Sequence, residues 1–131
     1  TDCFPAFYSR ESPMKLAHTV QTPLDAAYVL MSRLKTGIPG GIVLCNPIPI
    51  EEAVPYEELE SIINEAVIEA DRNHIEKKAV TPFLLSRLSQ KTDGRSLKAN
   101  KALLFHNASL ASKVAVEFGA LRRRSKKTIG F

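Results

Sequence analysis

The sequence predicts a mixed α/β fold in one domain, because capped amphipathic segments alternate with one short, continuously apolar run. The chain has 131 residues, of which 44% are apolar and 24% charged, so it is long enough to bury a core. Residues 42–45, Ile-Val-Leu-Cys, are apolar without alternation and lie between glycines and prolines. Such a run is typical of a strand that is covered on both faces.

Helix signals are clearest in residues 22–37. Thr22 is a good N-cap, Pro23 suits the first turn, Asp25 completes a capping box and Gly37 ends the segment. Further helices are expected over residues 54–73, 81–94 and about 96–118, whereas residues 1–10 suit an edge strand or a buried loop. The side chains expected to face inward are Ala26, Ala27, Leu30 and Leu34, then Leu59, Ile62, Ile63, Ala66 and Ala70, and finally Leu97, Asn100, Leu104, Asn107, Ala111, Val114 and Phe118.

The stretch GIPGGIVLCNPIP, residues 37–49, places a polar side chain where the expected strand must stop. Pro47 and Pro49 cannot donate ladder hydrogen bonds, so strand pairing is expected to end at Asn46. An amide at the carboxyl end of a buried strand is where open α/β sheets place ligand groups. The alternative is that Asn46 only bonds a local turn, and its position alone favours neither account.

Two asparagines interrupt the apolar stripe of the last expected helix. A buried amide without a partner costs about 1–3 kcal/mol, so Asn100 and Asn107 must each find hydrogen bonds. Either they tie the helix to neighbouring loops, which is the commoner role, or they face a polar cavity. Because they lie two turns apart on one stripe, a site near the N-terminal end of this helix is our hypothesis.

Composition and motifs argue against several classes of function. The last eleven residues, LRRRSKKTIGF, hold five basic residues, and the rest carries 13 Lys/Arg against 14 Asp/Glu, so no nucleic-acid-binding face is expected. We divide the chain into a folded part, residues 1–120, and a basic disordered tail, residues 121–131. The sequence lacks a membrane-length apolar run, a phosphate loop, a nucleophile elbow and a zinc-binding Cys/His cluster. Cys3 and Cys45 are expected to be reduced thiols.

Three strings, taken together, are specific enough to carry a resemblance. They are TDCFPAFYSRES, TPLDAAYVLMSRLKTGIPGGIVLCNPIP and KAVTPFLLSRLSQKTDGRSLKANKALLFHNASLASKVAVEF, in this order. They resemble the C-terminal part of the pseudouridine-5′-phosphate glycosidases, also called the indigoidine synthase A family. The resemblance runs from Thr1 to about Phe118 and covers less than half of the family's length. It implies a mixed α/β/α sandwich that is incomplete in this chain.

The resemblance implies an enzyme that cleaves the C–C glycosidic bond of pseudouridine 5′-phosphate to give uracil and ribose 5-phosphate. In that family a lysine forms a covalent adduct with the opened ribose, a glutamate transfers protons and an aspartate holds Mn²⁺. These three groups lie upstream of the position matching Thr1, so no catalytic residue and no metal ligand is expected here. The resemblance also implies a homotrimer, with fusion to a sugar kinase in some eukaryotic relatives. From the charge balance and the lack of a membrane-length apolar run we expect no nucleic-acid or membrane partner, and we expect a cytoplasmic location, with an organelle as the alternative.

Residue by residue, the resemblance assigns few functional positions to this chain. Asn100, in the string SLKAN, matches a substrate-site asparagine of the family, in agreement with the stripe argument. His106 replaces the more usual first asparagine of the family's NNA string. Cys3 stands where an acidic residue is common and His18 where a basic one is frequent, and neither change touches the implied chemistry. The weaker candidates for substrate binding are Asn46 and Asn107.

Two accounts of the whole chain remain open. In the first, it is a piece of an active glycosidase whose catalytic part lies elsewhere in the protein. In the second, it is a catalytically inactive product that serves as an oligomerisation or interaction module. The start at Thr1, without methionine, favours the first account.

Overall fold

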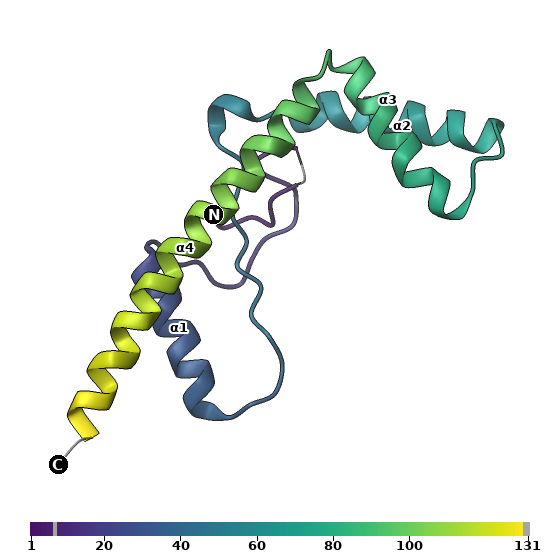
Figure 1. Cartoon of the computed structure of the whole chain (residues 1–131). Helices are drawn as coiled ribbons and strands as arrows, with labels where there is room; N and C mark the ends of the chain where they lie inside the picture. Colours follow the sequence, from purple (N-terminus) through teal and green to yellow (C-terminus); the bar gives the residue numbers. More distant parts are fainter. Residues whose placement is uncertain (7, 130–131) are drawn as a thin grey trace.

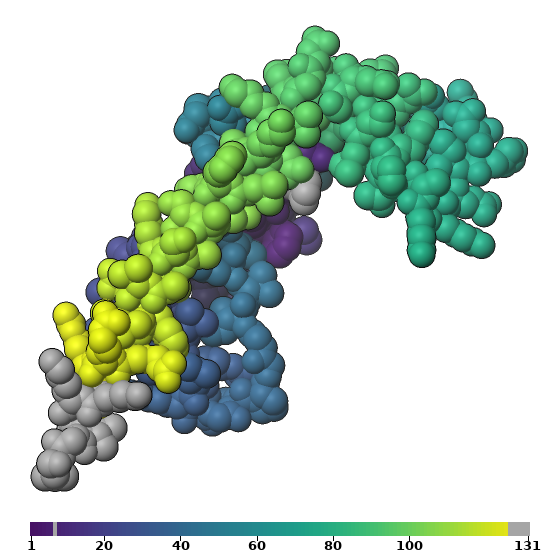
Figure 2. All heavy atoms as spheres, viewed as in Figure 1, coloured from purple at the N-terminus to yellow at the C-terminus, as the bar shows by residue number. Residues whose placement is uncertain are grey.

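The computed structural model describes residues 1–6 and 8–129, and its elements are arranged along one long helix (Figure 1). The elements are α1 (Pro23–Thr36), the 3₁₀ turn η1 (Ile50–Glu52), α2 (Tyr56–Arg72), the 3₁₀ turn η2 (Lys77–Ala79), α3 (Val80–Lys91) and α4 (Arg95–Ile129). Helix α1 packs along the C-terminal half of α4, and α2 and α3 form a hairpin that stands away from the other end (Figure 2). The four helices predicted from the sequence are therefore confirmed.

Helix α1 begins and ends as its sequence predicts. The Thr22 hydroxyl accepts a hydrogen bond from the Asp25 N–H at 3.1 Å, and the Asp25 carboxylate accepts one from the Thr22 N–H at 2.9 Å. Gly37 adopts a left-handed conformation with φ 63°, which ends the helix at no steric cost. The hydrogen bonds from Thr22, first that of its side chain and then that of its backbone, hold the pKa of the Asp25 carboxyl below its ordinary value.

The substitution Thr22→Ala should lower the free energy of unfolding by about 1 kcal/mol, because it removes the N-cap acceptor. Thr22→Ser keeps the hydroxyl and should retain most of the stability. In the folded chain the pKa of Asp25 lies below its ordinary value. The capping box of Thr22 and Asp25 therefore stabilises the fold fully above the ordinary carboxyl pKa, and this stabilisation is lost as the pH falls through the lowered pKa. Urea unfolding near neutral pH and in acid measures both effects, and equal stability of the alanine and serine variants near neutral pH would contradict the prediction.

The apolar core lies where the loop after residue 45 crosses the N-terminal end of α4. Ile48 is fully buried, and its carbonyl oxygen accepts a hydrogen bond from the Arg10 guanidinium at 2.5 Å. The Val54 N–H donates to the Tyr8 carbonyl at 3.0 Å, so the N-terminal segment is fixed to the same loop. The buried members of this core are Tyr8, Ile48, Val54, Leu59, Leu88 and Ala99.

Ion pairs fix the register of the helical hairpin. Carboxylates on α2 face basic side chains of α3 and the start of α4 in reverse order, as antiparallel helices require. These pairs are at least one-third exposed on both sides, so solvent screens their attraction and each contributes little to stability. The pairs are Glu69–Arg87, Glu65–Lys91 at 3.1 Å, and Glu58–Arg95.

The predicted interior strand at residues 42–45 is not formed. Across residues 1–6 and 8–129 there is no strand, only an isolated bridge between Cys3 and Lys15. Residues 42–45 instead belong to an open, irregular segment, in which Val43 is 84% exposed (Figure 1). A strand exists only when a neighbouring strand completes its ladder, and none of the described segments does so. The prediction of a buried strand is therefore wrong for this chain.

The predicted inward stripe of α4 is also partly wrong. Leu97 is 51% exposed and Leu104 is 63% exposed, whereas Ala99 and Val114 are buried. The face that carries Ala99 packs on the core around Ile48, and the face with Leu97 and Leu104 is left uncovered. Leu34 of α1, 64% exposed, was likewise expected to face inward and does not.

Helix α4 continues beyond the expected end near Phe118. Its backbone is helical to Ile129, so residues 121–129 are helical where a disordered tail was expected. Residues 130–131 lie outside the described residues. The division of the chain at residue 120 stays a prediction.

Candidate functional site

A groove of about 870 Å³ lies between α1, residues 42–47 and the C-terminal half of α4. Its lining is mostly apolar, with a few polar side chains, which is the character of small-molecule sites and of surfaces that another polypeptide covers. Apolar members include Val29, Leu30, Val114 and Phe118, and polar members include His18, Thr19 and Asn46.

Two side-chain hydrogen bonds fasten the Asn-Pro-Ile-Pro segment to α4. The Asn46 Nδ2 group donates to Asn107 Oδ1 at 3.0 Å. The His106 ring lies with Nδ1 3.1 Å from the Pro47 carbonyl oxygen, which can only accept, so Nδ1 carries the proton in this contact. The partners are about 60 residues apart in the sequence. The structure therefore brings together Asn46 and Asn107, two of the three predicted asparagines.

Asn100 lies apart from this contact. It is half-buried near the N-terminal end of α4, next to the fully buried Ala99, and its amide makes no hydrogen bond with another described residue. Seven residues separate it from Asn107, which corresponds to about 10 Å along the helix and nearly the same face. Asn100 is not among the residues that line the groove, and its role in substrate binding stays a prediction.

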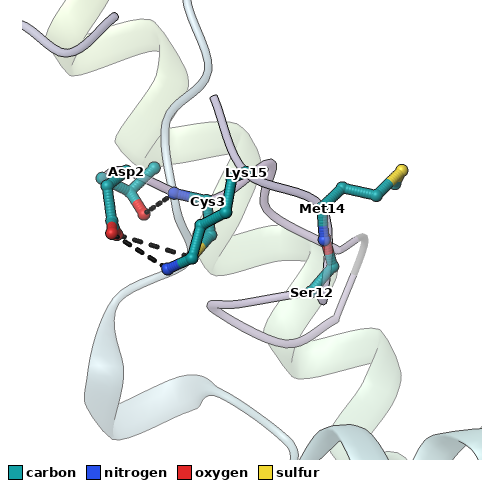
Figure 3. Close-up of polar contacts among 6 residues, drawn as sticks. Asp2, Cys3, Ser12, Met14 and Lys15 are labelled. Atoms are coloured by element: carbon teal, nitrogen blue, oxygen red, sulfur yellow. Dashed lines mark hydrogen bonds and ion pairs between the residues drawn. The ribbon is translucent and has the colours of Figure 1, made fainter. Parts of the chain in front are cut away.

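A short N-terminal hairpin forms one edge of the groove, to which it contributes Thr1 and Leu16. Backbone hydrogen bonds of 2.8 Å, from Phe4 to Met14 and from Leu16 to Asp2, hold its two arms together. Between these bonds, Cys3 and Lys15 form a non-hydrogen-bonded pair, the arrangement that brings side chains closest in an antiparallel ladder (Figure 3).

The side chains of this hairpin form a small polar cluster (Figure 3). Lys15 Nζ donates to Asp2 Oδ2 at 3.0 Å and to Cys3 Sγ at 3.2 Å. The hydrogen bond from Lys15, followed by that from Cys3, holds the pKa of the Asp2 carboxyl below its ordinary value. The same contacts, with Asp2 first, raise the pKa of Lys15. Both side chains are largely exposed, so solvent screens this ion pair and it contributes little to stability.

Other chemistry is scarce in the part of the chain that the structure describes. No three His, Cys, Asp or Glu side chains there gather closely enough to hold a metal ion. Cys3 and Cys45 are free thiols, as predicted. None of the described helices combines the length and apolar character needed to cross a lipid bilayer.

Sequence reasoning missed the Arg10–Ile48 contact and the place of His18 in the groove, because both depend on residues far apart in the chain.

Comparison with known proteins identifies the family. The family model described as indigoidine synthase A like protein matches residues 1–117, which include every residue of the groove lining before Phe118. The chain belongs to the indigoidine synthase A family. The resemblance seen in the three sequence strings is thereby confirmed.

Curated relatives in the indigoidine synthase A family are named pseudouridine-5′-phosphate glycosidases. The one from Caldanaerobacter subterraneus subsp. tengcongensis is 43% identical over 125 residues, which are 95% of this chain and 41% of the relative. The one from Staphylococcus aureus is 45% identical over 121 residues, 92% of this chain and 39% of the relative. This chain thus spans about two fifths of the length of these relatives.

Two solved structures share the fold. The prealnumycin C-glycosynthase AlnA, in complex with ribulose 5-phosphate, matches 95% of this chain and 41% of its own with a TM-score of 0.85 at 27% identity. An indigoidine synthase A-like protein from Thermotoga maritima matches 89% of this chain and 38% of its own, with a TM-score of 0.76 at 34% identity. The predicted fold family is confirmed by these likenesses, and they again cover about two fifths of the longer chains.

Proposed function

We propose that this chain supplies part of the substrate site of a C-glycosidase that converts pseudouridine 5′-phosphate to uracil and ribose 5-phosphate. The observation that carries the proposal is the contact of Asn46 with Asn107 beside a groove in a chain whose relatives are named pseudouridine-5′-phosphate glycosidases. Cleavage of a C–C glycosidic bond needs a polar pocket for the ribose and the base, and carboxamides both donate and accept hydrogen bonds there.

In this proposal the carboxamides bind and orient the substrate. Asn100 is the first candidate, because its half-buried amide has no hydrogen bond with another described residue and can serve a sugar hydroxyl, a uracil edge or a phosphate oxygen. Asn46 and Asn107 are weaker candidates, since one donor of Asn46 and the oxygen of Asn107 are engaged with each other, which leaves Asn46 Oδ1 and Asn107 Nδ2 for a ligand. His106 fixes Pro47 and so holds the loop that carries Asn46 in place.

The bond-breaking groups belong, in the proposal, to the remaining part of the family's domain. These are the lysine nucleophile, the glutamate acid/base and the aspartate for Mn²⁺, which would stabilise negative charge during the reaction. The described residues of this chain do not gather a donor set that fits a metal ion, so no step is assigned to a metal on them. A homotrimer, a cytoplasmic location and a fused sugar kinase belong to the proposal for the whole protein.

The 131-residue chain alone should release no uracil from pseudouridine 5′-phosphate in the presence of Mn²⁺. The physical reason is that it carries no lysine at the position of the family's nucleophile, so no covalent sugar adduct forms. Chromatography detects uracil, and mass spectrometry after borohydride treatment detects a trapped adduct. The S. aureus relative, assayed in parallel, is the positive control.

Either of two results would show that the active site lies within this chain. One is uracil release that requires Mn²⁺, and the other is a borohydride-trapped sugar on one of its lysines. The alternative role, an inactive oligomerisation or interaction module, also predicts no uracil release and no trapped sugar adduct from the chain alone. It differs by predicting no uracil release when the chain replaces the matched part of the C. subterraneus relative.

A further inference from the structure

We propose that Cys3 and Lys15 are the site of an oxidative cross-link, in which a peroxide oxidises the Cys3 thiol and the Lys15 amine then bonds to the sulfur. The product is a sulfenamide, with a covalent bond between Sγ and Nζ. It joins the two arms of the N-terminal hairpin at the edge of the groove. The inference rests on the geometry of residues 1–16 and does not depend on the proposed activity.

The two reacting atoms are already in contact. Lys15 Nζ lies 3.2 Å from Cys3 Sγ, and it also donates a hydrogen bond to Asp2 Oδ2 at 3.0 Å (Figure 3). Cys3 and Lys15 form the non-hydrogen-bonded pair that lies between two backbone hydrogen bonds of 2.8 Å. Because the ion pair with Asp2 is exposed and screened, the register of the hairpin is what brings Nζ to the sulfur.

The surroundings of Cys3 favour capture of the oxidised sulfur by this amine. Cys3 is 4% exposed, whereas the Lys15 side chain is 70% exposed, so a molecule as small as a peroxide has access along Lys15. Cys3 and Cys45 are both free thiols, and no hydrogen bond joins them in the described part of the chain. The Lys15 amine, already in contact with Sγ, is therefore the first nucleophile that the oxidised sulfur meets.

The first step oxidises the thiol. Sγ attacks one oxygen of hydrogen peroxide, the O–O bond breaks, and two electrons pass from sulfur to the peroxide. Asp2 Oδ1 accepts a hydrogen bond from the thiol at 3.4 Å, so it is placed to take the thiol proton and to pass it to the leaving hydroxide. The products of this step are a sulfenic acid at Cys3 and one molecule of water.

The second step needs no further oxidant. Lys15 loses one ammonium proton to solvent, and its neutral amine attacks the sulfur, as a backbone nitrogen does when a sulfenamide forms. The S–N bond forms while the S–O bond breaks, and the leaving hydroxide takes a second proton from the nitrogen to become water. Two equivalents of an added thiol reverse the link, since they restore the Cys3 thiol and the Lys15 amine and are themselves joined in a disulfide.

Tryptic mapping of the full 131-residue chain tests the proposal, because Arg10 lies between the two linked residues. The chain is treated with hydrogen peroxide, digested near neutral pH without reductant and analysed by mass spectrometry. We expect residues 1–10 joined to residues 11–33, without cleavage after Lys15, at a mass two hydrogen atoms below the sum of the two peptides. Dithiothreitol added after digestion should separate them.

Lys15→Arg and Lys35→Arg are the matched variants. Lys15→Arg keeps the positive charge, but its guanidinium stays protonated and is a poor nucleophile, so the yield of linked peptides should fall at least about tenfold. Cys3 should then be recovered as sulfinic acid, because its sulfenic acid is no longer captured. Lys35→Arg makes the same change at an exposed residue of α1 and should leave the yield unchanged.

Three results would overturn the proposal. The first is an equal yield of linked peptides from the two variants, and the second is a disulfide between Cys3 and Cys45 as the main product. The third is a linked pair that retains an oxygen atom between sulfur and nitrogen. Fragment spectra distinguish that oxygen from a sulfoxide at Met14, which is 60% exposed.

Two further measurements test whether the folded hairpin makes the link and is fixed by it. Unfolding the chain in urea before the peroxide treatment should lower the yield at least about tenfold, because the two residues then meet only by loop closure. In the linked, folded chain, the amides of Phe4 and Leu16, which bond across the hairpin, should exchange at least about tenfold more slowly. An equal yield in urea, or unchanged exchange of both amides, would contradict the proposal.

Discussion

Replacing Ile48 with alanine should lower the free energy of unfolding by about 3 kcal/mol, the typical cost of truncating a buried isoleucine. Ile48 is fully buried in the apolar core. Truncating its side chain leaves a cavity in the core that Ile48 shares with Tyr8, Leu59 and Ala99. Since the same residue anchors the loop that carries Asn46, the contact between Asn46 and Asn107 should weaken as well. Urea unfolding followed by circular dichroism measures the stability.

Ile50→Ala is the matched control for this prediction. It makes the same chemical change two residues away, at a side chain that is 75% exposed. We expect a change within about 0.5 kcal/mol for this surface position. Equal effects of the two substitutions would show that the loop after residue 45 is not anchored as the structure describes.

Replacing Asn100 with alanine should lower kcat/KM for pseudouridine 5′-phosphate by roughly ten- to a hundredfold, since one buried hydrogen bond contributes about 1–3 kcal/mol. The measurement is made in the chimera of this chain with the C. subterraneus relative, where the family's domain is complete. Because Asn100 makes no hydrogen bond with another described residue, its removal should leave the melting temperature nearly unchanged. If Asn100 has only a structural role, kcat/KM should stay nearly unchanged and the melting temperature should fall.

Asn64→Ala provides the comparison for Asn100. It truncates an exposed asparagine within a helix, α2, and should change neither kcat/KM nor stability. If Asn100→Ala shows near-normal kinetics together with a large loss of stability, Asn100 is a structural residue. If both variants lose activity equally, the effect does not arise from a substrate contact at Asn100.

Local signals in the sequence determined the helices. Thr22, Asp25 and Gly37 act on backbone groups within a few residues of themselves, so the bounds of α1 follow from the sequence alone. The family, too, was evident from three strings, because a family match depends on the order of residues and not on their contacts. The choice of asparagines as candidate site residues came from their polarity on an apolar stripe.

Contacts between distant residues were decided only by the tertiary structure. The pairing of Asn46 with Asn107 depends on where the loop after residue 45 crosses α4. The same crossing decides which face of α4 is buried, so Ala99 lies in the core and Leu97 is exposed. The apolar run at residues 42–45 has the composition of a buried strand, yet it is exposed here. Composition determines which residues favour burial, but a strand also needs a neighbour for its backbone hydrogen bonds, and that neighbour is a property of the assembled fold.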